Sequence, residues 1–165
     1  MSLPADMTLV VKNHPSMDEK TSNTYLEKIK FLPNVKLIDC RIPNWKIFKK
    51  CKIVIATSGT SVFEASVLNI PVIQLGNLGT IRMLPNVHFH NNLSNLKEKI
   101  KDILKIKINE KDSHERMIEY IHAAFKKGIK YNMWDDLILK KPEVKEELFN
   151  CYYSEIERLT NNFKD

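Results

Sequence analysis

Short apolar runs rich in β-branched residues alternate with segments of helical periodicity from residue 7 to residue 104. Each run is the length of a buried strand, and turn residues bound it. Strands that alternate with helices predict a parallel sheet with helices on both faces. The sequence therefore predicts an α/β domain with a Rossmann-like parallel sheet of about five strands. The expected strands cover residues 8–13, 35–39, 52–57, 70–75 and 87–90.

Helical periodicity fills the connections between these strands and continues beyond them. In the short helix that Pro43 opens, Trp45 and Phe48 are expected to face inward. Asp112 and Glu115 have the spacing of a capping box at the start of a later helix. We expect one domain, with a core over residues 7–105 and additional C-terminal helices over residues 112–163. The expected helices cover residues 18–32, 43–50, 61–68, 93–104, 112–125 and 142–163.

The length indicates one domain, and the cysteine content is typical of a cytoplasmic protein. A chain of 165 residues suits one domain with a real core. No apolar run approaches the roughly 20 residues that cross a bilayer, and the N-terminus does not read as a signal peptide. Cys40, Cys51 and Cys151 are odd in number and match no zinc or redox spacing, so we expect reduced thiols.

The formal net charge of +6 suits an anionic ligand, an anionic membrane surface or nucleic acid. The lysines are spread along the chain, and no basic run is interleaved with aromatic residues as a nucleic-acid groove requires. We therefore expect most lysines on solvated helix faces and no nucleic-acid partner. A peripheral contact with the inner membrane surface remains among the expected interactions.

The unusual loops all follow a predicted strand. Right-handed crossovers put such loops on one edge of a parallel sheet, and ligands of these sheets bind at that carboxyl edge. We therefore expect a binding site where these loops meet. The loops are His14-Pro15, residues 39–43, residues 58–60 and residues 76–80.

The strongest local signal is the hydroxyl-rich loop that runs from Thr57 to Ser61 between a strand and a helix. A helix N-terminus offers unpaired N–H groups and a positive dipole end to a phosphate. Gly59 would let the phosphate approach the backbone, while Ser58, Thr60 and Ser61 would add hydroxyl donors. Ordinary helix capping is the competing interpretation, since capping and phosphate binding can use the same side chains.

Glu64 lies one turn into the same helix and has two interpretations. Its carboxylate can accept hydrogen bonds from ribose hydroxyls, as an acidic residue does in dinucleotide folds. Its spacing from Ser61 also fits a capping box. The sequence does not decide between the two.

The segment Lys12-Asn13-His14-Pro15-Ser16 provides the second signal. A histidine at the carboxyl end of a strand, fixed by the following Pro15, can donate a hydrogen bond to a phosphate or leaving group. A histidine that caps the next helix is the alternative. Lys12 points toward the same edge only if strand alternation allows it.

The sequence lacks the residues that other kinds of functional site require. His88 and His90 alternate on a short strand, but no cysteine or carboxylate cluster accompanies them, so we expect no metal site. The chain contains no glycine fingerprint for NAD, no phosphate-loop lysine motif, no nucleophile elbow and no zinc-protease motif.

Three segments together carry a family resemblance. Lys12-Asn-His-Pro-Ser16, Thr57-Ser-Gly-Thr-Ser61 with Phe63-Glu-Ala65, and Ile70-Pro-Val-Ile-Gln-Leu-Gly76 resemble the C-terminal, nucleotide-sugar-binding domain of GT-B glycosyltransferases. The pattern is most similar to bacterial capsule-polysaccharide transferases that use CMP-Kdo and to bacterial sialyltransferases that use CMP-sialic acid. The resemblance covers about residues 7–105.

The resemblance implies an inverting transfer from a CMP-activated sugar to a glycan or glycolipid, in surface or capsular polysaccharide or lipooligosaccharide synthesis. His14 would contact the phosphate and assist leaving-group departure. Ser58, Gly59, Thr60 and Ser61 would hold the same phosphate, Glu64 would face the ribose, and residues 39–43 would meet the base.

The same resemblance implies that no metal is required and that the nucleotide sugar is the only small molecule the reaction needs. It also places the general base on an N-terminal, acceptor-binding domain that this chain lacks, so we expect that further sequence precedes Met1 and that the fragment alone is inactive.

Two other functions stay open. A UDP-sugar-dependent transferase or a UDP-GlcNAc 2-epimerase-like enzyme would use the same fold, although the His-Pro pair favours CMP. A non-catalytic nucleotide-binding module would keep the fold without turnover. A response-regulator-like domain is disfavoured, because Asn13 and His14 stand where clustered acidic residues would be needed.

Overall fold

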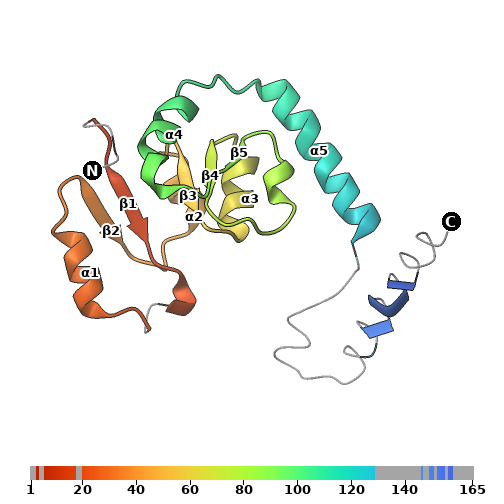
Figure 1. Cartoon of the computed structure of the whole chain (residues 1–165), viewed down its shortest axis with the longest axis horizontal. Helices are drawn as coiled ribbons and strands as arrows, with labels where there is room; N and C mark the ends of the chain where they lie inside the picture. The colour runs from red at the N-terminus through yellow and green to blue at the C-terminus, as the bar shows by residue number, and fades with distance from the viewer. Residues whose placement is uncertain are drawn as a thin grey trace. The chain divides into compact units, whose positions relative to one another are not determined.

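A computed structural model describes residues 3, 6–17, 20–128, 146, 149–150, 152–154 and 156–157. The chain forms two compact units, residues 1–120 and residues 121–165, which divide within one long helix. The first unit is mixed α/β and contains all the strands of the described residues (Figure 1).

Strands and helices follow one another in the expected order, and most of them are shorter than the sequence predicts. The strands are β1 (Leu9–Lys12), β2 (Val35–Ile38), β3 (Val54–Ala56), β4 (Val72–Gln74) and β5 (Val87–Phe89). The helices are α1 (Asn23–Lys30), α2 (Asn44–Phe48), α3 (Thr60–Val67), α4 (Leu96–Ile103) and α5 (Glu110–Lys127), with 3-10 turns η1 (Pro15–Met17), η2 (Ile81–Met83) and η3 (Leu93–Asn95).

The strands of the described residues form two parallel sheets rather than one. β1 pairs with β2, and β4 lies between β3 and β5 (Figure 1). Among residues 6–17 and 20–128 no ladder joins the two sheets, so the single sheet of about five strands expected from the sequence is not shown. Within the described residues β1 pairs with β2 on one edge and has no partner on the other, and its Leu9 and Val10 are 36% and 39% exposed. An apolar run does not specify ladder partners, because the ladder bonds join backbone groups that every residue carries.

Helices cover both faces of the three-stranded sheet, as expected. Successive side chains of a strand point to opposite faces. Val72 accordingly packs with α3 residues and with Met117 of α5, whereas Ile73 packs with Ile100 and Ile103 of α4. Because both faces of β4 are buried, its first two residues, Val72 and Ile73, are both apolar.

A buried polar cluster holds α3 against the sheet at the amino edge. Asn86 Nδ2 donates to the carbonyl oxygens of Ser66 and Ile70, each at 3.0 Å. The hydroxyl of Ser66 donates to Asn86 Oδ1. These bonds satisfy polar groups at the end of α3 and at the start of β4, where water does not reach.

Two local predictions were wrong. Phe48 of α2 is buried at 8% exposure, but Trp45 is 52% exposed. Ile47 and Phe48 pack into the core beside α3, whereas Trp45 lies in the first turn of α2, beyond that contact. The helix α5 begins at Glu110 rather than at Asp112, because the side chain of Asn109 accepts from the N–H groups of Lys111 and Asp112.

The second unit holds the end of α5 and the described residues beyond it. Residues 146, 149–150, 152–154 and 156–157 are helical, as the sequence predicts for the last helix. The rings of Phe149 and Tyr153 stack, with their centroids 6.0 Å apart. The rest of the predicted helix over residues 142–163 lies outside the described residues.

The amide cluster gives a stability prediction. Replacing Asn86 with alanine removes the partner of two buried carbonyl groups and of the Ser66 hydroxyl. We expect Asn86→Ala to lower the free energy of unfolding by about 3 kcal/mol. Asn92→Ala is the matched control, because Asn92 is exposed and only accepts from the Ser94 N–H; its cost should be about 1 kcal/mol or less. Urea unfolding followed by circular dichroism measures both, and equal losses would contradict the structural role of Asn86.

Candidate functional site

The loop after β3 turns on Gly59, whose φ of +96° lies in the region that L side chains rarely adopt. A Cβ at this position would meet no atom within 4 Å, so the glycine answers a backbone requirement rather than a steric one. The turn places Gly59 at the N-cap of α3. The backbone of the loop is thus set by one glycine.

The first turn of α3 has no side-chain cap. Gly59 offers no oxygen from a side chain, and the N–H groups of the first turn have no intrahelical partner beyond the 3.2 Å bond from Val62 N to Gly59 O. These groups form the positive end of the helix dipole. The helix terminus therefore keeps its donors available to an anion from solution.

The hydroxyl groups predicted to bind phosphate surround this terminus without other partners. Thr60 is exposed, and Ser58, Ser61 and Glu64 are half-buried. Within the described part of the chain none of these four side chains makes a hydrogen bond. The capping box between Ser61 and Glu64 is wrong, because Ser61 is already the second residue of α3 and cannot act as its N-cap.

The loop after β1 is ordered by Asn13. Asn13 Nδ2 donates to Thr21 Oγ1 at 2.8 Å and to the carbonyl of Met17 at 3.2 Å. Asn13 Oδ1 accepts from the N–H of His14 at 3.0 Å. The loop then enters η1 at Pro15, so both sides of His14 are fixed in the backbone.

Hydrogen bonding also selects the tautomer of His14. The backbone N–H of Ser16 donates to His14 Nδ1 at 3.2 Å, and Ser16 Oγ lies 2.7 Å from the same nitrogen. A backbone N–H can only donate, so Nδ1 is the acceptor and the neutral ring carries its proton on Nε2. The ring is exposed. His14 therefore caps the first turn of η1 through Nδ1, and its neutral ring keeps the Nε2–H for another group.

Lys12 ends in a contact with α2. Its Nζ donates to Asn44 Oδ1 at 2.6 Å. Asn44, the first residue of α2, thus holds the lysine at the carboxyl end of β1. Sequence reasoning did not single out Asn44, because asparagine at a helix start is an ordinary capping residue.

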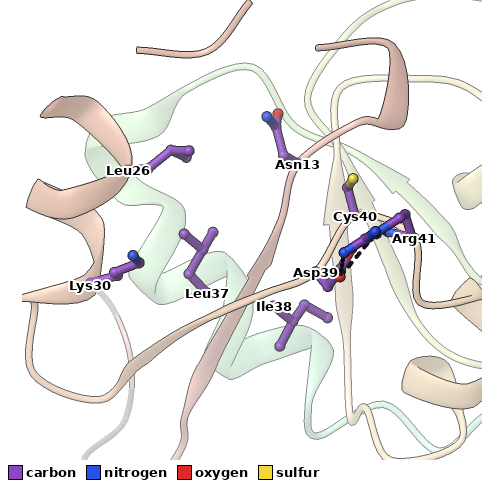
Figure 2. A pocket seen from close by; sticks show the side chains of 8 residues that line it. All are labelled: Asn13, Leu26, Lys30, Leu37, Ile38, Asp39, Cys40 and Arg41. Carbon is purple, nitrogen blue, oxygen red and sulfur yellow. Dashed lines mark hydrogen bonds and ion pairs between the residues drawn. The ribbon is translucent and has the colours of Figure 1, made fainter. Parts of the chain in front are cut away.

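A cavity of about 340 Å³ lies beside the two-stranded sheet, at the level of the segment after β2 (Figure 2). Its size is at the lower end for small-molecule sites. Asp39, Cys40 and Arg41 line it together with Asn13, so part of the predicted base-binding segment, residues 39–43, does border a cavity. The remaining lining residues are Leu26, Lys30, Leu37 and Ile38.

An ion pair dominates the polar side of this cavity (Figure 2). Arg41 Nη2 lies 2.6 Å from Asp39 Oδ2, and Arg41 Nε donates to Oδ1 of the same carboxylate at 3.0 Å. The N–H of Arg41 also donates to Asp39 Oδ1 at 2.8 Å. These side-chain and backbone hydrogen bonds lower the pKa of Asp39 to about 2, so the carboxylate stays ionised.

The loop after β4 is held closely against the loop after β3. The N–H of Gly76 donates to the Thr57 carbonyl at 2.9 Å, and a Cβ on Gly76 would lie 2.6 Å from that oxygen. Gln74, which sequence reasoning did not single out, donates from Nε2 to the Leu78 carbonyl at 2.7 Å. Gly76 therefore permits the close approach of two loops at the carboxyl edge of the three-stranded sheet.

The predicted site residues fall into two groups. Lys12, His14 and Pro15 follow or end β1 of the two-stranded sheet, and residues 58–61 with Glu64 follow β3 of the three-stranded sheet. Among the described residues no hydrogen bond or ion pair connects these two groups. Each group has its own local architecture, and their convergence on one ligand stays a prediction.

Two further properties of the described residues concern metal binding and membranes. No group of three or more His, Cys, Asp or Glu side chains there could hold a metal ion. Burial and the charge of Lys99 hold the pKa of His88 below its usual value. Within the same residues no helix is long and apolar enough to cross a membrane.

Comparison with known proteins gives no relatives: no family model, curated protein or solved structure matches the chain.

The Asp39–Arg41 pair predicts a measurable titration. We expect Arg41→Gln to raise the pKa of Asp39 from about 2 toward the ordinary 3.8, because the side-chain donors are lost while the backbone N–H remains. In the parent chain, the ionised Asp39 should stabilise the folded state above pH 3.8. This contribution to the free energy of unfolding should disappear as the pH falls through about 2. Carbon NMR of the Asp39 carboxyl group reads the titration, and an unchanged pKa in the variant would show that the arginine does not act on it.

Proposed function

We propose that this chain is the nucleotide-sugar-binding half of an inverting GT-B glycosyltransferase that uses a CMP-activated sugar of the Kdo or sialic acid type. The supporting observation is the N-terminus of α3: Gly59 caps it without a side chain, and the nearby hydroxyls of Ser58, Thr60 and Ser61 make no bonds within the described residues. Capping alone would use such a hydroxyl, whereas here the donors stay available to a phosphate.

In this proposal the nucleotide phosphate lies at the α3 terminus. The N–H groups of the first turn and the hydroxyls of Ser58, Thr60 and Ser61 donate to its oxygens, and the helix dipole favours its charge. Glu64, which is not engaged in a capping box, accepts from the ribose hydroxyls. The cavity beside Asp39 and Arg41 receives the base, since its volume of about 340 Å³ accommodates a single ring.

His14 stabilises the leaving group. The acceptor hydroxyl attacks the anomeric carbon of the sugar, the bond from that carbon to the phosphate oxygen breaks, and the electron pair leaves with CMP. The Nε2–H of His14 donates to the phosphate as this charge develops. In this proposal the proton of the acceptor passes to a base on an acceptor-binding domain.

We also propose that the two parallel sheets are parts of one larger sheet. The strands of β1-β2 and β3-β4-β5 would belong to one Rossmann-like sheet, with the loops of His14 and Gly59 at the same carboxyl edge. All the ladders of the described residues are parallel, which agrees with this arrangement. The proposed location is cytoplasmic.

Nucleotide titration tests the proposal on this chain. Isothermal calorimetry with CMP, UDP and GDP should show CMP binding most tightly. Removing the Thr60 hydroxyl in Thr60→Val should weaken CMP binding about tenfold, the value of one hydrogen bond to a charged group. His14→Ala should weaken it by a similar factor. A non-catalytic nucleotide-binding module would show the same nucleotide affinities. An assay of sugar transfer with the full-length protein distinguishes this module from the transferase, because only the transferase turns over.

Thr24→Val is the matched control, because Thr24 is an exposed residue in the first turn of α1 and takes no part in the proposed site. Its affinity for CMP should equal that of the parent chain. Tight UDP binding without CMP binding would replace the donor class by the UDP-sugar alternative. A folded chain that binds none of the three nucleotides would contradict the proposal.

A further inference from the structure

The exposed tryptophan of α2 is the least expected feature of the described surface. Trp45 is 52% exposed, although the side chains of Ile47 and Phe48 in the same short helix pack into the core. The ammonium groups of Lys46 and Lys49 lie 5.5 and 5.2 Å from the centroid of its ring. Two cations thus rest on one exposed aromatic side chain, at cation–π distance.

The charged residues next to Trp45 in the sequence are all positive. The segment from Asn44 to Lys52 contains four lysines and no acidic residue. All four lysines are exposed, and among the described residues none of them forms an ion pair. Ile42, which precedes α2, is also exposed. We call this set the Trp45 surface: Ile42, Trp45, Lys46, Lys49, Lys50 and Lys52.

This combination matches the chemistry of a membrane interface. Tryptophan is enriched at the level of lipid headgroups, because its ring is apolar and its N–H needs a polar partner. Lysines on the same surface attract anionic headgroups, and their long stems let the ammonium groups reach the headgroup layer. The apolar part consists of Trp45 and Ile42, whereas a stable protein interface needs about 800 Å² per partner.

Nucleic acid offers the same negative charge but a worse fit to Trp45. Binding of single strands uses aromatic faces on which bases stack. Here the ammonium groups of Lys46 and Lys49 lie over the ring. A headgroup layer needs no open ring face, since the indole lies among the lipids with its cations beside the phosphates.

The position of α2 in the fold determines which part of the domain would face the membrane. The helix begins in the connection that leaves the carboxyl end of β2, and Asn44 in its first turn holds Lys12 at the end of β1. The Trp45 surface therefore adjoins the edge where the loops of β1 and β2 lie. A chain docked through α2 would present this edge close to the lipid surface.

We propose that the Trp45 surface docks this chain on an anionic membrane surface. The proposal rests on α2 and does not require nucleotide binding, so either proposal can fail without the other. Docking would hold the domain where lipid-linked molecules are found.

Vesicle co-sedimentation of the full 165-residue chain tests the docking. The chain should bind vesicles of equal parts phosphatidylglycerol and phosphatidylcholine, and not vesicles of phosphatidylcholine alone. The triple variant Lys46→Gln, Lys49→Gln, Lys50→Gln should bind on the order of a hundredfold more weakly, since each lysine near an anionic surface contributes roughly fivefold. Circular dichroism checks that each variant remains folded.

A charge-matched triple variant separates a specific surface from the overall positive charge. Lys97, Lys101 and Lys107 lie on α4 or just after it, are exposed and form no ion pair within the described residues. Replacing all three with glutamine changes the net charge by the same amount and should leave vesicle binding within about twofold, because these lysines do not belong to the Trp45 surface. Equal losses in the two triple variants would overturn the proposal.

Fluorescence reports on Trp45 itself. With Trp134→Phe, Trp45 is the single remaining tryptophan of the two in the chain. Its emission should shift to the blue on phosphatidylglycerol vesicles, because the ring leaves water. An unshifted emission, or no binding to the anionic vesicles, would overturn the proposal. Binding of single-stranded oligouridine that the first triple variant abolishes, without vesicle binding, would assign the surface to nucleic acid instead.

Discussion

The side chain of Asn86 connects the end of α3, the start of β4 and the segment before β5. Its amide donates to the Ser66 and Ile70 carbonyls and accepts from the Ser66 hydroxyl, with the whole cluster buried. An α-helix of eight residues is rigid, so fixing its last turn also fixes its first. The position of the open α3 terminus beside the sheet therefore depends on a polar cluster at the opposite edge.

This arrangement separates the groups that hold the fold from those that can meet a ligand. Thr57 and Gly76 bind each other through backbone atoms, and Gly59 turns the chain by its own conformation. The hydroxyls of Ser58, Thr60 and Ser61 are not needed for either. In the loop after β1, Asn13 supplies the internal bonds while His14 uses only Nδ1, which leaves the Nε2–H directed to other partners. Both loops are ordered without their candidate ligand-binding atoms.

Sequence reasoning predicted the elements well because their signals are local. Within the described residues, apolar runs and turn residues located the five strands, and periodicity located the helices, with ends that differ by a few residues. Their assembly was less predictable. The pairing of β1 with β2 alone follows from which backbone edges meet, and no side-chain pattern encodes this directly.

The individual side chains show the same limit. Spacing put Trp45 and Phe48 on one helix face, but α2 is so short that the core contact reaches only Phe48 and Ile47. The capping boxes at Ser61 and at Asp112 failed because Gly59 and Asn109 begin the helices earlier. Asn13, Asn44 and Gln74 were missed, since their partners lie in other segments or depend on how a loop closes.

Chemical-shift mapping with CMP tests most directly whether the loop of His14 and the loop of Gly59 contact one ligand. A shared phosphate site predicts that CMP shifts the NMR signals of the backbone amides of Gly59, Thr60 and Ser61 together with that of His14 Nε2, while the side-chain amide signal of Asn86 stays unchanged. Shifts confined to one loop, or centred on residues away from both, would contradict a shared phosphate site at this edge.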